Sequence, residues 1–154
     1  MQTESISSLK KALLQMNSDQ LVDACLRLAR FKKDNKGLLT YLLFLSRDEA
    51  GYIDSLCGHI DEQFALTPKA HRKTVRKIIR WMDKCLRFSG IKETEVQVRL
   101  HFCQALVSSK TPYQTSRVIN NMLTGQIKKT RKAMEKFHKD VRLEYEQQID
   151  LLTH

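Results

Sequence analysis

The chain has 154 residues, of which 42% are hydrophobic and 29% are charged, and it carries a net charge of +10. This composition is typical of a soluble globular protein, and because no run of about 18 apolar residues occurs, the sequence predicts no membrane span. The N-terminal residues also lack the apolar stretch of a signal peptide. Only two prolines and five glycines are present. Since turns and strand connections use these residues, their scarcity predicts long helices joined by short links.

The first half of the chain has the apolar spacing of successive helices. A short helix near the N-terminus is followed by a second that begins at Ser18. Segment 38–45, LLTYLLFL, is almost wholly apolar. Because leucine dominates it rather than valine or isoleucine, it predicts a short buried helix. Ser46 and Glu49 have the spacing of a capping box, which predicts that the next helix, 46–66, begins there.

The second half of the chain is also helical in pattern, and its breaks are easier to place. Pro68 marks the start of a helix, since proline fits a first helical turn, and Gly90 is suited to a left-handed helix end. Gly125 marks a possible break or bend. The pattern predicts helices over 69–89, 92–109 and 114–124, and a long C-terminal helix from about 126 to 152.

Together these elements predict an all-α protein, with a single domain of six or seven helices over residues 1–154. Successive helix pairs of about 35 to 45 residues favour a short HEAT-like α–α superhelix, and an antiparallel helical bundle is the alternative. The predicted core comprises Leu21, Cys25, Leu28, Leu42, Leu43, Ile53, Leu56, Ile78, Ile79, Met82, Leu86, Leu100, Cys103, Leu106, Phe137 and Val141.

Two segments, 21–44 (LVDACLRLARFKKDNKGLLTYLLF) and 73–106 (KTVRKIIRWMDKCLRFSGIKETEVQVRLHFCQAL), carry a resemblance to known sequences. They resemble a family of uncharacterised bacterial all-helical proteins of about this length, over most of the chain. The resemblance implies an all-helical fold. It implies no activity, cofactor or functional residue.

The cysteines and the one metal-like motif predict no catalytic or metal chemistry. Cys25, Cys57, Cys85 and Cys103 are far apart in the sequence and form no C-x-x-C pair. They are therefore expected to be buried free thiols, typical of a cytoplasmic protein, and not zinc ligands. A single Glu135-x-x-His138 has the spacing of a di-iron motif, but that chemistry needs two copies and further carboxylates. No phosphate-binding glycine loop is present, so the sequence predicts no cofactor and no enzyme activity.

Positive charge is concentrated in stretches 69–87 and 126–142, whose combined net charge of +12 exceeds that of the whole chain. In the first stretch the basic side chains share an arc of about 140° on the predicted helix, opposite an apolar arc. These candidate anion- or nucleic-acid-binding residues are Lys69, Arg72, Lys73, Arg76, Lys77, Arg80, Lys84 and Arg87. The second stretch is broader, and its charges are expected to form a solvated face unless it shares a groove with the first.

Three explanations for the basic face of helix 69–87 stay open. Arginines four residues apart repel one another, so an unbalanced face predicts an anion that offsets the repulsion. That anion could be external, or it could be the acidic helix 46–66, and plain solvated charge is the third explanation. An internal origin predicts Asp54, Asp61 and Glu62 within about 4 Å of the arginines. An external origin predicts arginines in solvent and acids turned away.

The sequence therefore favours a non-enzymatic cytoplasmic interaction module that binds another macromolecule through a helical surface. The alternative is binding of nucleic acid without sequence preference through the basic face of helix 69–87. Binding to a membrane surface is disfavoured, because the apolar arc of this helix is needed for the core. The sequence names neither the partner nor an oligomeric state.

Overall fold

The computed structural model describes residues 1–153, and over this range the chain is all-helical with no strand, which confirms the predicted fold class. Residues 1–153 form eight α-helices and one π-helical turn, where the sequence predicted six or seven helices. The helices form two compact units, residues 1–44 and residue 45 onward, and each is described by itself. That residues 1–154 form a single domain stays a prediction.

Unit 1 comprises three short helices: α1 (Ile6–Leu14), α2 (Ser18–Phe31) and α3 (Lys33–Thr40). Each of the first two has a side-chain cap. The Ser5 oxygen accepts from the Ser8 N–H, and Asn17 forms a reciprocal capping box with Gln20. Helices α2 and α3 pack against each other. The π-helical turn η1 (Tyr41–Leu45) follows α3 directly.

The predicted core of unit 1 is not buried. No residue of α1, α2 or α3 is buried, Cys25 is exposed, and Leu28, Leu42 and Leu43 are each more than half exposed. The buried helix predicted over 38–45 is also wrong, since α3 ends at Thr40 and only Tyr41 of η1 is buried. Two short packed helices cannot surround a side chain, so their amphipathic pattern leaves an apolar face uncovered within this unit. Leu21 is half-buried.

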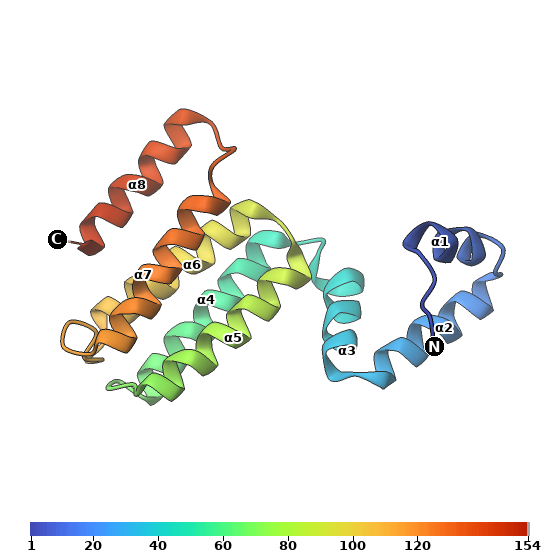
Figure 1. Ribbon diagram of the computed structural model, residues 1–154, viewed down its shortest axis with the longest axis horizontal. Helices are drawn as coiled ribbons and strands as arrows, with labels where there is room; N and C mark the ends of the chain where they lie inside the picture. Colours follow the sequence, from blue (N-terminus) through green and yellow to red (C-terminus); the bar gives the residue numbers. More distant parts are fainter. Residues whose placement is uncertain (154) are drawn as a thin grey trace. The chain divides into compact units, whose positions relative to one another are not determined.

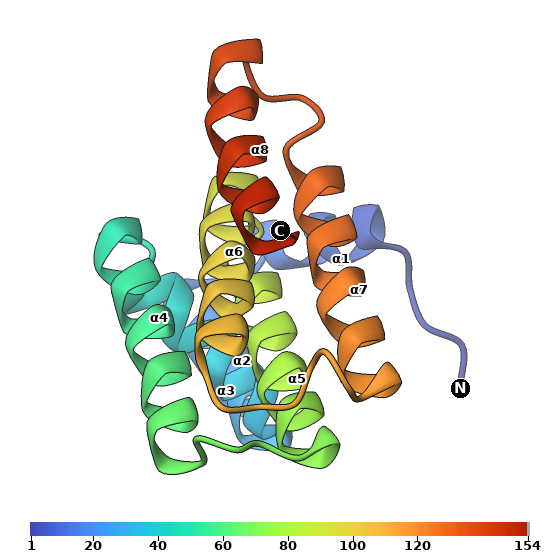
Figure 2. The same ribbon diagram turned by 90° about the vertical axis from the view of Figure 1, so that its left-hand side faces the viewer.

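Unit 2 contains five longer helices: α4 (Glu49–Leu66), α5 (Arg72–Ser89), α6 (Lys92–Ser108), α7 (Arg117–Ala133) and α8 (Lys139–Thr153). They form two layers (Figures 1 and 2). Helices α4, α6 and α8 pack side by side in one layer, and α5 and α7 pack side by side in the other. Helix α6 contacts all four of the other helices, and it is buried around most of its circumference.

The core of unit 2 follows the sequence prediction closely. Leu56, Ile78, Met82, Leu86, Leu100, Cys103 and Leu106 are buried as predicted. Ile53, Ile79 and Phe137 are half-buried, and Val141 is exposed. Val141 lies in the first turn of α8, whose single buried residue is Ile149, near the other end of the helix. Its place in the predicted core was therefore wrong.

Two predicted helix starts in unit 2 are also corrected. Helix α4 is capped by Asp48, whose carboxylate accepts from the Gly51 N–H at 3.0 Å, and not by Ser46. Ser46 still lies in the turn that leaves η1, where the Asp48 N–H donates to the Leu45 carbonyl. Helix α5 begins at Arg72 rather than at 69. The N–H of buried Ala70 donates to Thr111 Oγ1, which holds residue 70 against the loop before α7 and delays the helix. The predicted end at Gly90 is confirmed, with φ of +68°.

The long C-terminal helix predicted over 126–152 is divided in two. Helix α7 continues through Gly125 and ends at Ala133, and α8 begins at Lys139. An unbroken helix from 117 to 153 would be about 55 Å long, roughly twice the length of α6, and would extend beyond the core. The break turns the chain back, so that α8 packs on α6 and Ile149 becomes fully buried.

Candidate anion-binding site

The basic face predicted on α5 is present and lies in solvent. Seven of the eight predicted residues are exposed, and Lys84 is half-buried. Lys69 precedes the helix, and the other seven lie on it. On the opposite side Val75 and Met82 are fully buried. The helix therefore separates its cations from its apolar residues as the 3.6-residue period requires.

Asp61 and Glu62 of α4 contact histidines and not the arginines of this face, whereas Glu49 of α4 accepts hydrogen bonds from Ser89 of α5 and Thr94 of α6. Asp61 Oδ1 lies 2.7 Å from His101 Nε2 on α6, and Glu62 lies 3.8 Å from His59 of its own helix. Over residues 1–153, none of Arg72, Arg76 and Arg80 forms an ion pair. For these three arginines this is the arrangement expected if the charge serves an external anion or is simply solvated, and it does not fit their neutralisation by Asp54, Asp61 and Glu62.

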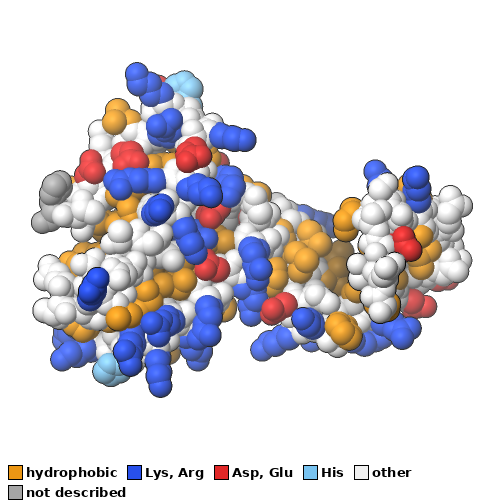
Figure 3. All heavy atoms as spheres, in the orientation of Figure 1, with side chains coloured by type: hydrophobic (Ala, Val, Ile, Leu, Met, Phe, Trp, Pro, Cys, Tyr) orange, Lys and Arg blue, Asp and Glu red, His pale blue; other side chains and the backbone are white. Residues whose placement is uncertain are grey.

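A groove runs between α5 and α7 and joins the two basic stretches. It has a volume of about 750 Å³, its walls carry Lys73, Arg76 and Arg80 from α5 and Lys129 from α7, and no acidic side chain lines it. Figure 3 shows Lys and Arg side chains gathered over these two helices, with hydrophobic side chains between them. The groove is completed by Ile79, Met122, Gly125 and Gln126. Sequence reasoning identified the α5 wall but not the wall that α7 supplies.

Lys129 is the one cation of the second basic stretch that lines the groove. Lys128 and Lys132 of α7 are exposed and form no ion pair within the described chain. Arg131, by contrast, pairs with Glu146 of α8 at 3.1 Å. This ion pair therefore links α8 to α7.

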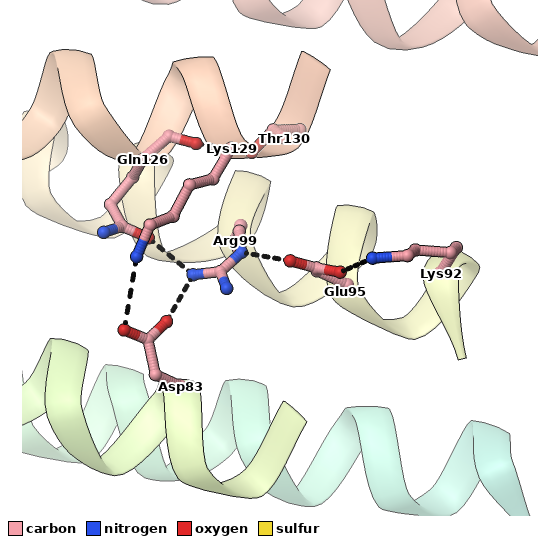
Figure 4. Close-up of polar contacts among 7 residues, drawn as sticks. All are labelled: Asp83, Lys92, Glu95, Arg99, Gln126, Lys129 and Thr130. Atoms are coloured by element: carbon pink, nitrogen blue, oxygen red, sulfur yellow. Dashed lines mark hydrogen bonds and ion pairs between the residues drawn. The ribbon is translucent and has the colours of Figure 1, made fainter. Parts of the chain in front are cut away.

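A buried arginine, which sequence reasoning missed, connects the two walls of the groove (Figure 4). Arg99 of α6 is 6% exposed and donates through Nη1 to Asp83 of α5 at 2.6 Å and to Gln126 of α7 at 2.8 Å. Its Nε donates to Glu95 at 3.0 Å. Asp83 also pairs with Lys129 at 3.4 Å. The only local signal was Glu95, four residues before Arg99 on the same predicted helix.

The electrostatics of this network favour the charged form of Glu95. Burial alone raises the pKa of its carboxyl, but hydrogen bonds from Lys92 and Arg99, and the positive charges of both, outweigh burial and lower the pKa below its ordinary value. Glu95 in turn holds the Arg99 guanidinium in place, since Arg99 donates to it directly. The network therefore fixes α5, α6 and α7 relative to one another and sets the width of the groove.

The residues considered for other chemistry lie apart from this groove. Burial, with Asp61 and Asp54 adding to it, raises the pKa of the Cys57 thiol to about 11. Burial also raises the pKa of the Cys103 thiol to about 12, although Arg99 opposes it. Both thiols therefore stay protonated near neutral pH and are poor nucleophiles.

The Glu135-x-x-His138 motif lies in the break between α7 and α8, not within one helix. Both side chains are exposed, and His138 Nδ1 lies 3.6 Å from an Asp140 carboxylate oxygen. Across the part of the chain that the structure describes, no three His, Cys, Asp or Glu side chains are placed to share a metal ion.

Among residues 1–153, no helix combines the length and the hydropathy that a membrane crossing requires. Comparisons of the chain with protein-family models, with curated proteins and with solved structures found no match.

Proposed function

We propose that this protein is a non-enzymatic interaction module and that the macromolecule it binds is nucleic acid, held through its phosphates without sequence preference. The observation that carries the proposal is the groove between α5 and α7, where Lys73, Arg76, Arg80 and Lys129 face one another and no acid lines the walls. Like charges gathered in this way repel one another in the free protein. A polyanion relieves the repulsion and releases its own counterions, which favours binding.

The chemistry of the groove favours phosphates over bases as the contacted groups. One arginine guanidinium group can donate two parallel hydrogen bonds to two oxygens of a phosphate. Arg76 and Arg80 are exposed and form no ion pair within residues 1–153, so both are available for such contacts. No aromatic side chain lines the groove, whose apolar contacts come from Ile79 and Met122. Because base recognition in single strands depends on aromatic stacking, this lining supports backbone binding. Phosphate contacts carry no direct sequence information, which is why no preference is expected.

The proposal also includes the helix arrangement of unit 2 and the location of the protein. The contacts of α4 with α6, α6 with α8 and α5 with α7 support a short HEAT-like α–α superhelix in unit 2, because such repeats stack equivalent helices in two layers. A cytoplasmic location is proposed from the four free cysteines. Membership of the all-helical family that the sequence resembles stays a prediction.

The test is a binding titration with a fluorescein-labelled 20-base-pair DNA duplex, at several salt concentrations from about 50 mM to about 200 mM. The test variant replaces Lys73, Arg76 and Arg80 with glutamine. If each side chain neutralises one phosphate, the slope of log affinity against log salt falls by about 2.7, at about 0.9 for each contact. All three positions are exposed, so the variant is expected to keep its melting temperature.

The matched control replaces Lys10, Lys11 and Lys110 with glutamine, which removes the same charge from exposed positions outside the groove. The control is expected to keep most of its affinity and its salt dependence. An equal loss in both variants would mean that net charge, and not the groove, attracts the duplex. Absence of any binding by the wild type at about 50 mM salt would instead favour a protein partner for the groove.

A further inference from the structure

A second groove lies within unit 1, between α2 and α3, and it combines an apolar floor with a basic rim. Its volume is about 740 Å³. Leu26, Leu39, Leu43 and Phe44 supply the large apolar side chains of the lining, together with the small or polar Ala29 and Thr40. The charged residues of the lining are Arg30, Lys33 and Lys36, and no acidic side chain is among them.

Three of the four large apolar side chains of this groove are exposed to solvent, and Leu39 is half-buried. Phe44 is 71% exposed, Leu43 is 51% exposed and Leu26 is 41% exposed. Single exposed apolar residues are ordinary, but here they line one concavity and are rimmed by cations, which is typical of an interaction site. Arg30, Lys33 and Lys36 are exposed and form no ion pair among the described residues.

We propose that this groove binds an amphipathic helix of a partner protein, with large apolar side chains along one face and acidic side chains beside them. A helix presents apolar anchors at i, i+3, i+4 and i+7, and these can enter a groove between two helices while its flanks stay near the rim. Acidic flanks on such a helix would pair with Arg30, Lys33 and Lys36, which makes the charge complementary to the groove.

Three other occupants fit the observations less well. A second copy of this chain, related by a two-fold axis, would place the same three cations opposite themselves. An anionic membrane is met by apolar side chains on an outward-facing helix surface, and here they line a concavity. Nucleic acid would satisfy the rim but would leave the apolar floor of Leu26, Leu43 and Phe44 uncovered.

This proposal is independent of the proposed nucleic-acid binding. The residues that line this groove belong to α2, α3 and η1. The residues that line the groove proposed to bind nucleic acid belong to α5 and α7. The glutamine variant of Lys73, Arg76 and Arg80 is therefore expected to bind the acidic helix as the wild type does. If one of the two binding activities is absent, the other is still expected, and both can be measured on the same protein.

The experiment uses the full chain and two designed fluorescein-labelled peptides of about 18 residues, long enough for helix formation on binding. Both carry leucines at helical spacing on one face. The first has glutamates flanking the leucines, and the second has lysines at the same positions. Fluorescence anisotropy measures the affinity of each peptide. The wild type is expected to bind the acidic peptide at least tenfold more tightly than the basic one.

The decisive variant reverses two charges of the rim, Lys33→Glu and Lys36→Glu. It is expected to weaken binding of the acidic peptide at least tenfold and to strengthen binding of the basic peptide. The matched control, Lys10→Glu with Lys11→Glu, makes the same charge change on exposed positions of α1 outside the groove and is expected to leave both affinities unchanged. Circular dichroism spectra identical to the wild type establish that both variants fold.

Three results would overturn the proposal. One is equal weakening in the rim variant and the control, which would reduce the effect to net charge. Another is binding of the acidic peptide that survives Leu43→Ser with Phe44→Ser, since the floor would then play no part. The third is failure of the wild type to bind the acidic peptide while it binds vesicles of anionic phospholipid in a manner that Phe44→Ser abolishes, which would assign the surface to a membrane.

Discussion

Replacement of Arg99 with methionine is expected to lower the free energy of unfolding of unit 2 by about 3 kcal/mol. Methionine keeps most of the length and the apolar stem of arginine, so the substitution removes hydrogen bonds with little change in packing. The perturbation therefore addresses the network that joins α5, α6 and α7, and it leaves the apolar core of α6 in place.

The magnitude follows from what each partner of Arg99 retains. The carboxylates of Asp83 and Glu95 keep Lys129 and Lys92 as partners, so each loses only about 0–1 kcal/mol. Gln126 is 4% exposed, and its oxygen loses the arginine donor, which costs about 1–3 kcal/mol. The total lies near the lower end of the cost of about 3–5 kcal/mol for breaking a buried ion pair, because the two acids are not left alone.

Trp81 makes the measurement specific to unit 2. It is the only tryptophan in the chain, it lies on α5, and its ring contacts His59 of α4 with centroids 4.1 Å apart and ring planes tilted by 41°. Its fluorescence during urea denaturation therefore reports the packing of α5 on α4. Unit 2 has about 110 residues, so at about 4 °C for each kcal/mol the melting temperature is expected to fall by about 12 °C.

The control is Arg87→Met, which makes the same chemical change at an exposed position of α5. Its expected cost is within about 0.5 kcal/mol. A cost below about 1 kcal/mol for Arg99→Met, or equal costs for the two variants, would refute the argument that the network holds the three helices together.

Three further measurements test other parts of the structure. The pKa of Glu95 is lower in the folded protein than in the unfolded chain, so its charged form stabilises the fold at pH values above the unfolded pKa. This stabilisation is lost as the pH falls through the folded-state pKa. The melting temperatures of the wild type and Glu95→Gln should therefore differ near pH 7 and converge in acid. Exposed Cys25 is expected to react rapidly with a thiol reagent near pH 8, whereas Cys103, with its pKa raised to about 12, reacts only on unfolding; a fast phase that persists in Cys25→Ser would contradict this. Gly90→Ala is expected to destabilise the protein by about 1–2 kcal/mol, because φ is +68° there, although a Cβ atom would meet nothing within 4 Å. The equally open Gly58→Ala, inside α4, is expected to stabilise it by up to about 1 kcal/mol, and chemical denaturation of both variants checks the pair.

Features that depend only on residues close together in the sequence could be predicted from the sequence. The helical class, the left-handed end at Gly90 and the opposed faces of helix α5 all follow from local spacing and backbone preference. The split between α7 and α8 was missed because Gly125 offered a visible break, whereas the true end at Ala133 is set by packing of α8 on α6. Tertiary contact decided this boundary over local propensity.

Burial in unit 1 was predicted wrongly for a different reason. An amphipathic pattern around Cys25 and Leu28 indicates that a helix face is favourably covered, but it does not say what covers it. Of the candidate site, the sequence supplied the α5 cations alone. Lys129 and Arg99 come from other helices, and their approach to Asp83 depends on how α5, α6 and α7 pack. No spacing within one helix encodes such an approach.

At Asp83, conformational stability and the proposed anion affinity are in opposition. Its carboxylate anchors Arg99 from one side and Lys129 from the other, so the fold is stabilised by a negative charge directly beside the groove. That same charge reduces the positive potential that a phosphate would meet and engages one of the four cations of the walls. Substitutions here are therefore expected to exchange one property for the other, and a chain evolving towards tighter binding would have to replace the lost anchor elsewhere.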